Sequence, residues 1–186
     1  MLPLAITGGI AEGKSTVLEV LRKEGLRVLS ADDLVADLWQ DAEVLSMLAE
    51  ILDLNGTITK ELVRAAIVDS PGARKKVNLL FHPLVFDRMM ESRADAVEVP
   101  LLIETCLQGS FERIWVVTCG SEVQLGRLSG RVGVEQAYKL LRLQLPTRVK
   151  MSFSDEVIRT NGSMEDVHTA TLRALERHRR RESLAQ

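Results

Sequence analysis

A glycine-rich segment close to the N-terminus, residues 8–16 (GGIAEGKST), constrains the fold of this chain more than any other feature. It matches the pattern G-x-x-x-x-G-K-[ST], in which a tight loop joins a buried strand to the first turn of a helix. The flanking residues fit, because the apolar run Leu4–Ile6 precedes the loop and apolar residues recur at helical spacing after it. The segment therefore predicts strand, loop and helix in that order, within an α/β fold.

A loop of this kind is an anion site, since its backbone N–H groups and the positive end of the helix dipole point at one spot. Gly8 and Gly13 allow backbone angles that side chains would forbid. We expect Lys14 to reach the β- and γ-phosphates of a nucleoside triphosphate and the Ser15 hydroxyl to ligate Mg²⁺. The alternative, a glycine turn followed by an exposed lysine, does not explain the strand-loop-helix context.

Composition limits the other possibilities. The 186 residues have a net charge of −2, which gives no reason to expect nucleic-acid or membrane binding. No apolar run approaches the roughly 18 residues of a membrane span, and no signal sequence precedes the loop, so we expect a cytoplasmic protein. Cys106 and Cys119 do not form a C-x-x-C pair, and three scattered histidines lack metal-ligand spacing. The expected partner is a small molecule, and the expected state is a monomer or weak homo-oligomer.

A second strand is predicted at Leu26–Leu29, and Asp32 and Asp33 follow it. Functional groups in open α/β sheets lie just past the carboxyl ends of strands, so a carboxylate here can face the phosphates. Successive strand residues point to opposite sides, which makes a shared role for both aspartates unexpected. A helix N-cap remains an alternative, chiefly for Asp33.

Residues 34–94 are predicted to be mostly helical. One helix is expected near Lys60–Val68, a break at Ser70–Gly72, and then a further helix interrupted at Phe81–Pro83. The block contains no predicted strand, so it is interpreted as a helical insertion. Basic residues such as Arg64 are, singly, more typical of a solvated surface.

Three more strands are predicted at Ala96–Leu102, Arg113–Thr118 and Glu156–Ile158, and a last helix at Met164–Arg177. Between the fourth and fifth strands, Arg127 and Arg131 are four residues apart and so share one face of a helix. Two guanidinium groups aimed at one place suit a triphosphate. A surface-charged helix is the alternative, and the glycine loop favours the first interpretation.

Taken together, the motifs resemble those of dephospho-coenzyme A kinases, over nearly the whole chain. The markers are Thr7–Ile10 with Gly13–Thr16, Ala31–Asp32, His82–Pro83, Val99–Leu102 with Glu104, Gln124 with Arg127 and Arg131, Gln144, and Asp155 with Val157–Ile158 and Asn161–Gly162. The resemblance implies a P-loop NTPase fold like that of nucleoside-monophosphate kinases, with a five-stranded parallel sheet flanked by helices. It implies a core (1–30, 95–124, 151–186), a substrate-binding helical insertion (31–94) and a lid (125–150).

The same resemblance implies ATP-dependent phosphorylation of the ribose 3′-hydroxyl of dephospho-CoA. Asp32 falls on the catalytic aspartate and Arg131 on the lid arginine, with Lys14 completing the catalytic set. The implied nucleotide-binding residues are Gly9, Ala11, Glu12, Gly13, Lys14, Ser15, Thr16, Arg127, Asn161 and Gly162, the last two beside the adenine. The implied substrate-binding residues are Asp32, Arg64, His82, Pro100 and Leu101. Another small-molecule kinase and a non-catalytic ATP-binding homologue are the alternatives.

Some positions depart from the family pattern. Ser30 replaces a further aspartate, and Ala11-Glu12 replaces a pair of small residues. We expect the Glu12 side chain to lie near the triphosphate charge unless it turns outward to water. On that basis, Glu12→Ser is predicted to tighten ATP binding.

Overall fold

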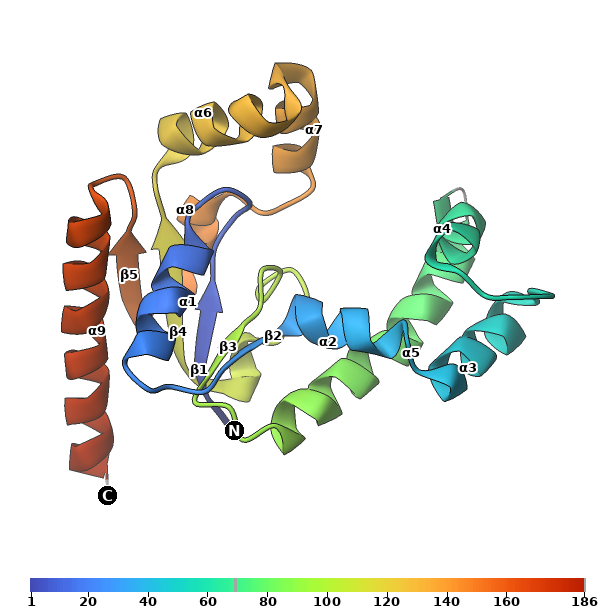
Figure 1. Cartoon of the computed structure of the whole chain (residues 1–186), viewed down its shortest axis with the longest axis horizontal. Coiled ribbons are helices and arrows are strands. Elements are labelled where there is room, and N and C mark those ends of the chain that lie inside the picture. Colours follow the sequence, from blue (N-terminus) through green and yellow to red (C-terminus); the bar gives the residue numbers. More distant parts are fainter. Residues whose placement is uncertain (69, 186) are drawn as a thin grey trace. The chain divides into compact units, whose positions relative to one another are not determined.

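The computed structural model of the chain describes residues 1–68 and 70–185 (Figure 1). The chain divides into two compact units. One comprises Met1–Leu29 with Arg93–Gln186, and the other comprises Ser30–Ser92. Among the described residues, no helix is long and apolar enough to cross a membrane.

The first unit is built on a parallel sheet of five strands in the order β2-β3-β1-β4-β5. The strands are β1 (Leu2–Thr7), β2 (Val28–Ser30), β3 (Ala96–Glu98), β4 (Phe111–Thr118) and β5 (Glu156–Arg159). The middle strand β1 reads as a continuous apolar run, because both faces of a parallel sheet are covered. Ile6 pairs with Glu98 on one side and with Trp115 on the other. This register brings the carboxyl ends of the three central strands to the same edge, where the glycine loop begins.

Helices α1 (Lys14–Lys23) and α9 (Met164–Ala185) pack together against this sheet (Figure 1). The core they close contains buried apolar residues from β1, β4, β5 and both helices, including Leu4, Ile6, Leu21, Trp115 and Leu175. Helix α1 ends as its sequence predicts, since Gly25 follows its C-cap with a φ of 86°. The remaining helices of this unit are α6 (Ser121–Val132), α7 (Val134–Arg142) and the short α8 (Thr147–Lys150), with 3₁₀ turns η1 (Gln108–Ser110) and η2 (Met151–Phe153).

Two predicted boundaries in this unit are wrong by four residues or more. The third strand ends at Glu98 rather than Leu102, because Pro100 has no N–H for the sheet and its carbonyl accepts side-chain hydrogen bonds instead. The last helix continues beyond Arg177 to Ala185. Neither glycine nor proline interrupts that stretch, and an Arg180–Glu176 ion pair supports the added turns.

The second unit contains four helices in its described residues: α2 (Ala31–Leu38), α3 (Ala42–Leu52), α4 (Lys60–Val68) and α5 (Pro71–Glu91). They surround a separate apolar core of Leu38, Val44, Leu48, Val63, Val77 and Phe81. Asp41 caps α3 by accepting the backbone N–H of Glu43, and its other oxygen lies 2.6 Å from Arg88 Nη2 on α5. The prediction that this block is mostly helical is confirmed.

The predicted interruption at Phe81–Pro83 is also wrong, since α5 runs through Pro83 without a break. A proline removes one helical hydrogen bond and costs roughly 3 kcal/mol in a helix interior. The buried side chains of Val77 and Phe81, which lie in the preceding turns, anchor the helix in the core and offset that cost. Ser70 and Pro71 form the N-terminus of α5, and the Ser70 hydroxyl accepts the N–H of Ala73.

Candidate active site

The loop between β1 and α1 packs so closely on its surroundings that two of its glycines cannot be replaced. Gly8 has a φ of +149°, and a Cβ atom there would lie 2.4 Å from the Val117 carbonyl oxygen. Gly13 has a φ of +87°, and its Cβ would lie 2.8 Å from Thr160 Oγ1. Ala11 also has a positive φ, 61°, which costs a residue with a Cβ about 1–2 kcal/mol. The loop therefore requires glycine at positions 8 and 13, and it holds Ala11 in a strained backbone conformation.

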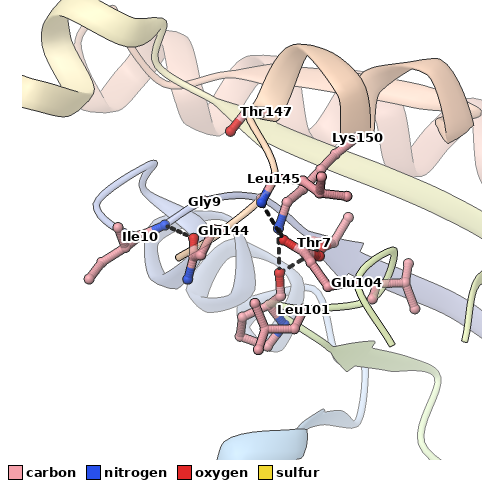
Figure 2. Close-up of polar contacts among 12 residues, drawn as sticks. Thr7, Gly9, Ile10, Leu101, Glu104, Gln144, Leu145, Thr147 and Lys150 are labelled. Atoms are coloured by element: carbon pink, nitrogen blue, oxygen red, sulfur yellow. Dashed lines mark hydrogen bonds and ion pairs between the residues drawn. The ribbon is translucent and has the colours of Figure 1, made fainter. Parts of the chain in front are cut away.

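Side chains from distant parts of the chain hold the backbone of this loop. Both backbone polar groups of Ile10 are hydrogen-bonded to glutamine side chains. Its N–H donates to Gln144 Oε1 at 3.0 Å, and its carbonyl accepts from Gln124 Nε2 at 3.0 Å. The carbonyl of Glu12 accepts a 2.6 Å hydrogen bond from Thr160 Oγ1. Figure 2 shows the contact between Ile10 and Gln144. Both glutamines were family markers without a role, and the structure gives them a role in shaping the loop.

Lys14 lies over the loop. Its Nζ donates to the carbonyls of Gly8 and Gly9 at 3.1 and 3.0 Å, and it is 3.9 Å from Glu98 Oε1. Glu98 is the last residue of β3, and the sequence analysis did not single it out. The rule that functional groups follow the carboxyl ends of strands would have found it, had the end of β3 been predicted correctly.

A pocket of about 380 Å³ opens at the carboxyl edge of the sheet, which is within the size range of small-molecule sites. It brings together most of the predicted nucleotide-binding residues. Its lining residues are Ile10, Ala11, Glu12, Gly13, Lys14, Ser15, Thr16, Glu98, Arg127, Arg131, Thr160, Gly162, Met164 and Val167. Gly9 and Asn161 are not among these lining residues. Gly9 is a buried residue of the loop, and its carbonyl accepts a hydrogen bond from Lys14 Nζ.

The two predicted arginines of α6 both line this pocket. Arg127 is tied down, because its Nη2 donates to the Thr160 carbonyl at 2.7 Å and its Nη1 to Thr160 Oγ1 at 3.4 Å. Arg131 lies one turn further along and is exposed. The spacing of four residues therefore places two cations beside the phosphate loop, one fixed and one extended into solvent.

Three of the predicted site residues belong to the second unit. Asp32, Arg64 and His82 are all exposed, on α2, α4 and α5 respectively. Pro100 and Leu101 follow β3 in the first unit and are not among the lining residues of the pocket. The Pro100 carbonyl accepts hydrogen bonds from Thr7 and Lys150, and the Leu101 side chain is 40% exposed.

The local structure decides the alternative considered for the two aspartates. Helix α2 begins at Ala31 and its N-cap is Ser30, which has extended backbone angles. Asp32 and Asp33 therefore both lie in the first helical turn, where negative charge is favourable, and neither is the N-cap. The N-cap interpretation of Asp33 is wrong because the helix starts at Ala31, three residues earlier than that interpretation requires.

An ion pair between a buried lysine and a partly buried glutamate joins α8 to the turn after β3. Lys150, at the end of α8, is completely buried, and its Nζ lies 2.8 Å from both Glu104 Oε1 and the Pro100 carbonyl (Figure 2). The N–H of Leu145 also donates to Glu104 Oε1, at 2.9 Å. Burial opposes ionisation of Glu104, but the hydrogen bonds from Lys150 and the backbone outweigh it, so its pKa lies below the usual range. The segment before and within α8 is thereby fixed to the turn after β3.

A parallel sheet with a glycine loop after its middle strand, a lysine over that loop and two arginines beside it defines a P-loop nucleotide-binding protein. A sequence model of the family described as dephospho-CoA kinase matches residues 2–166. The dephospho-CoA kinase of Fusobacterium nucleatum subsp. nucleatum is 32% identical over 177 residues, covering 88% of this chain and 92% of its own. The chain belongs to the dephospho-CoA kinase family, which is a family of ATP-dependent kinases, and the resemblance drawn from its motifs is confirmed.

Solved structures support the fold. The crystal structure of TT1252 from Thermus thermophilus superposes with a TM-score of 0.79 at 29% identity, covering 94% of this chain and 95% of that chain. The dephospho-CoA kinase from Campylobacter jejuni gives a TM-score of 0.63 at 21% identity, covering 95% and 97%. The predicted P-loop fold with its five-stranded parallel sheet is therefore confirmed.

Proposed function

We propose that this protein transfers the γ-phosphoryl group of ATP to the ribose 3′-hydroxyl of dephospho-CoA, giving CoA and ADP. The observation that carries the proposal is the pocket in which the glycine loop, Lys14 and the two arginines of α6 come together. Membership of the dephospho-CoA kinase family supplies the acceptor. The competing proposal, a kinase for another small molecule on this fold, has no observation in its favour.

Phosphoryl transfer requires alignment and neutralised charge more than covalent chemistry from the protein. In this proposal the N–H groups of residues 11–16 and the ammonium of Lys14 hold the β- and γ-phosphates. Arg127 keeps its contact with Thr160 and so presents its charge from a fixed position. Arg131, which is exposed on the next turn, moves with the lid onto the transferring group. Gly162 lines the pocket, and we assign Asn161 and Gly162 to the adenine end.

Mg²⁺ prefers oxygen ligands and usually keeps several waters in sites that also hold phosphates. The residues that line the pocket include the hydroxyl of Ser15 and the carboxylate of Glu98, so they fit the ion. No described residues form a cluster of three or more His, Cys, Asp or Glu side chains that could hold a metal without a nucleotide. We assign Ser15 as the protein ligand, and the ion, when bound, neutralises charge on the β- and γ-phosphates.

Asp32 is assigned as the base that accepts the proton of the ribose hydroxyl. It follows β2 directly, in the first turn of α2, and its exposed carboxylate is available to an acceptor. A positioned base of this kind contributes about 10²- to 10⁴-fold to rate. Ser30, two residues earlier, supplies no second carboxylate, so the assignment rests on Asp32 alone.

The remaining assignments concern substrate binding and closure. We propose that residues 31–94, with Arg64 and His82, bind dephospho-CoA together with Pro100 and Leu101 after β3. Residues 125–150 form the lid, whose closure excludes water that would otherwise compete with the ribose hydroxyl.

The test is incubation of the purified protein with Mg-ATP and dephospho-CoA, followed by mass spectrometry of the products. Adenosine and common nucleosides serve as control acceptors. We expect CoA and ADP from dephospho-CoA, and no phosphorylated product from the controls. Phosphorylation of a control acceptor in preference to dephospho-CoA would reject the proposed substrate, and nucleotide binding without any product would indicate a non-catalytic homologue.

A further inference from the structure

The side chain of Glu12 is buried, although the residue lies in the middle of an anion-binding loop. It is only 1% exposed. Its Oε2 accepts the backbone N–H of Cys119 at 2.9 Å, and its Oε1 accepts the hydroxyl of Thr147 at 2.8 Å. The sequence-based expectation was a carboxylate near the triphosphate or turned to water. The second alternative is wrong, because the carboxylate turns into the protein and both of its oxygens are engaged there.

The two donors come from separate parts of the unit. Cys119 is the first residue after β4, at the carboxyl edge of the sheet, whereas Thr147 is the first residue of α8, the last helix of the proposed lid. One carboxylate therefore joins the phosphate loop to a fixed strand end and to the segment by which the lid returns to the core. Gln144, three residues before Thr147, makes the second connection by accepting the N–H of Ile10.

A buried carboxylate is costly unless it is well hydrogen-bonded, so these two contacts account for its presence. Its charge acts on its neighbour, since the pKa of the Cys119 thiol is raised first by burial and then by the Glu12 carboxylate. The packing around it is close as well: a Cβ on Gly9 would lie 2.5 Å from Gln124 Nε2 and 3.1 Å from Thr147 Oγ1. The loop cannot shift here without breaking contacts to charged or polar atoms.

We propose that Glu12 is a positioning residue for nucleotide binding. Its carboxylate clamps the loop to the Cys119 N–H and to the Thr147 hydroxyl, and so fixes the direction of the loop N–H groups that bind phosphate. The proposal rests on the proposed function only in taking a nucleotide as the ligand. It reverses the expectation from sequence: serine is too short to reach either donor, so Glu12→Ser weakens ATP binding.

The chain offers two matched pairs of variants. Glu12→Gln keeps both contacts, because the amide oxygen accepts from Cys119 and the amide nitrogen donates to the Thr147 hydroxyl, whereas Glu12→Ala removes both. Thr147→Ser keeps the hydroxyl and Thr147→Val removes it at nearly constant volume. Loss of a hydrogen bond to a charged group costs an amount of free energy that corresponds to about a tenfold or larger change in an equilibrium constant. We expect Glu12→Ala and Thr147→Val to raise the Kd of ATP and ADP by about that factor, and the Gln and Ser variants to stay within about threefold.

Asp155 provides the control for a general loss of structure. Its Oδ2 accepts the N–H of Ile114 at 2.8 Å and its Oδ1 lies 2.8 Å from Arg113 Nη1, so it is also a carboxylate that joins a strand to a side chain. It lies before the amino end of β5, away from the pocket lining. Asp155→Ala should lower the midpoint of thermal unfolding without changing nucleotide affinity.

The experiment is calorimetric titration of each folded variant with ADP and with ATP, alongside thermal unfolding and steady-state kinetics. A positioning role raises the KM for ATP while leaving the KM for dephospho-CoA within about twofold, a split that general destabilisation does not produce. The double variant Glu12→Ala with Thr147→Val should bind no more weakly than Glu12→Ala alone, because both remove the same clamp. If Glu12→Ala does not fold, Thr147→Val carries the test.

Unchanged or tighter nucleotide binding by Glu12→Ala and Thr147→Val would overturn the proposal, as would an equal loss of affinity in Asp155→Ala. Failure of the proposed function is distinguishable, because it appears in the wild type as nucleotide binding without CoA formation. The titrations do not use dephospho-CoA and so remain decisive in that case.

Discussion

Lys150 Nζ lies 2.8 Å from Glu104 Oε1, and the lysine is completely buried. The same ammonium donates to the Pro100 carbonyl at 2.8 Å, so both charged groups depend on each other for solvation. Replacing a buried pair by apolar residues is often neutral, whereas removing one partner leaves an uncompensated charge. The pair therefore fixes α8, and with it the Thr147 end of the Glu12 clamp, only while both residues are present.

Lys150→Met should consequently destabilise the protein by up to about 3–5 kcal/mol in urea unfolding, because it leaves the partly buried Glu104 carboxylate without its cation. The double variant Lys150→Met with Glu104→Leu should recover a large part of that loss. A single variant as stable as the wild type would show that Glu104 reaches water when Lys150 is removed.

The depressed pKa of Glu104 predicts the pH dependence of stability. A carboxyl whose pKa is lower in the folded than in the unfolded protein contributes stability above its unfolded value of about 4.3. That contribution is lost as the pH falls through the lowered folded value. The free energy of unfolding should thus decrease below about pH 4.3 more steeply in the wild type than in Glu104→Gln.

Asp95 contributes to the wild-type slope in the same direction, because the hydrogen bond from Arg27 lowers its pKa as well. It is unchanged in Glu104→Gln, so the difference between the two proteins reports Glu104 alone. Urea unfolding of both proteins at a series of pH values from about 3 to 7 measures this difference in the free energy of unfolding. Parallel curves for the two proteins would contradict the prediction.

The order of elements was predictable from the sequence, because the signals are local. The glycine loop fixes β1 and α1, and the apolar runs near residues 111–118 and 156–159 mark β4 and β5. Helix α4 was predicted at its observed residues, and the predicted break at Ser70–Gly72 marks the start of α5. The predictions at two prolines were wrong. Pro83 was predicted to break a helix, but it lies inside α5, which tertiary packing maintains. Pro100 was included in the third strand, but β3 ends before it, and the Pro100 carbonyl accepts hydrogen bonds from side chains instead.

Contacts within the candidate site were less predictable. The loop itself and the pair Arg127 and Arg131 carry a recognisable spacing, and they line the pocket. The partners of Glu12 are 107 and 135 residues away in sequence, so no local pattern announces them. From the sequence, a glutamate in a phosphate loop is expected to repel the phosphates. Only the fold shows that the Glu12 carboxylate accepts hydrogen bonds from Cys119 and Thr147.

Ala11 offers a test of backbone strain. Its φ of 61° is in the left-handed region, which costs a residue with a Cβ about 1–2 kcal/mol. Ala11→Gly relieves that strain but gives the unfolded chain more freedom, worth about 0.4–1 kcal/mol in the opposite direction. We expect a net stabilisation of up to about 1.6 kcal/mol by urea unfolding, and clear destabilisation for Ala11→Val. Loss of stability in Ala11→Gly would mean that the strain is smaller than the geometry indicates.

Asp32 is the residue on which the proposed chemistry depends most. Asp32→Asn preserves the size and the position of the side chain in the first turn of α2 but removes the proton acceptor. It should lower kcat by about 10²- to 10⁴-fold while leaving the Kd of ATP unchanged, because the nucleotide is held by residues of the other unit. Asp33→Asn is the matched control, since it changes an equally exposed carboxylate in the same turn and should retain most of the wild-type kcat. The kcat for CoA formation and calorimetric titration with ATP measure the two quantities. A large loss of turnover in Asp33→Asn with normal activity in Asp32→Asn would transfer the role of base to Asp33.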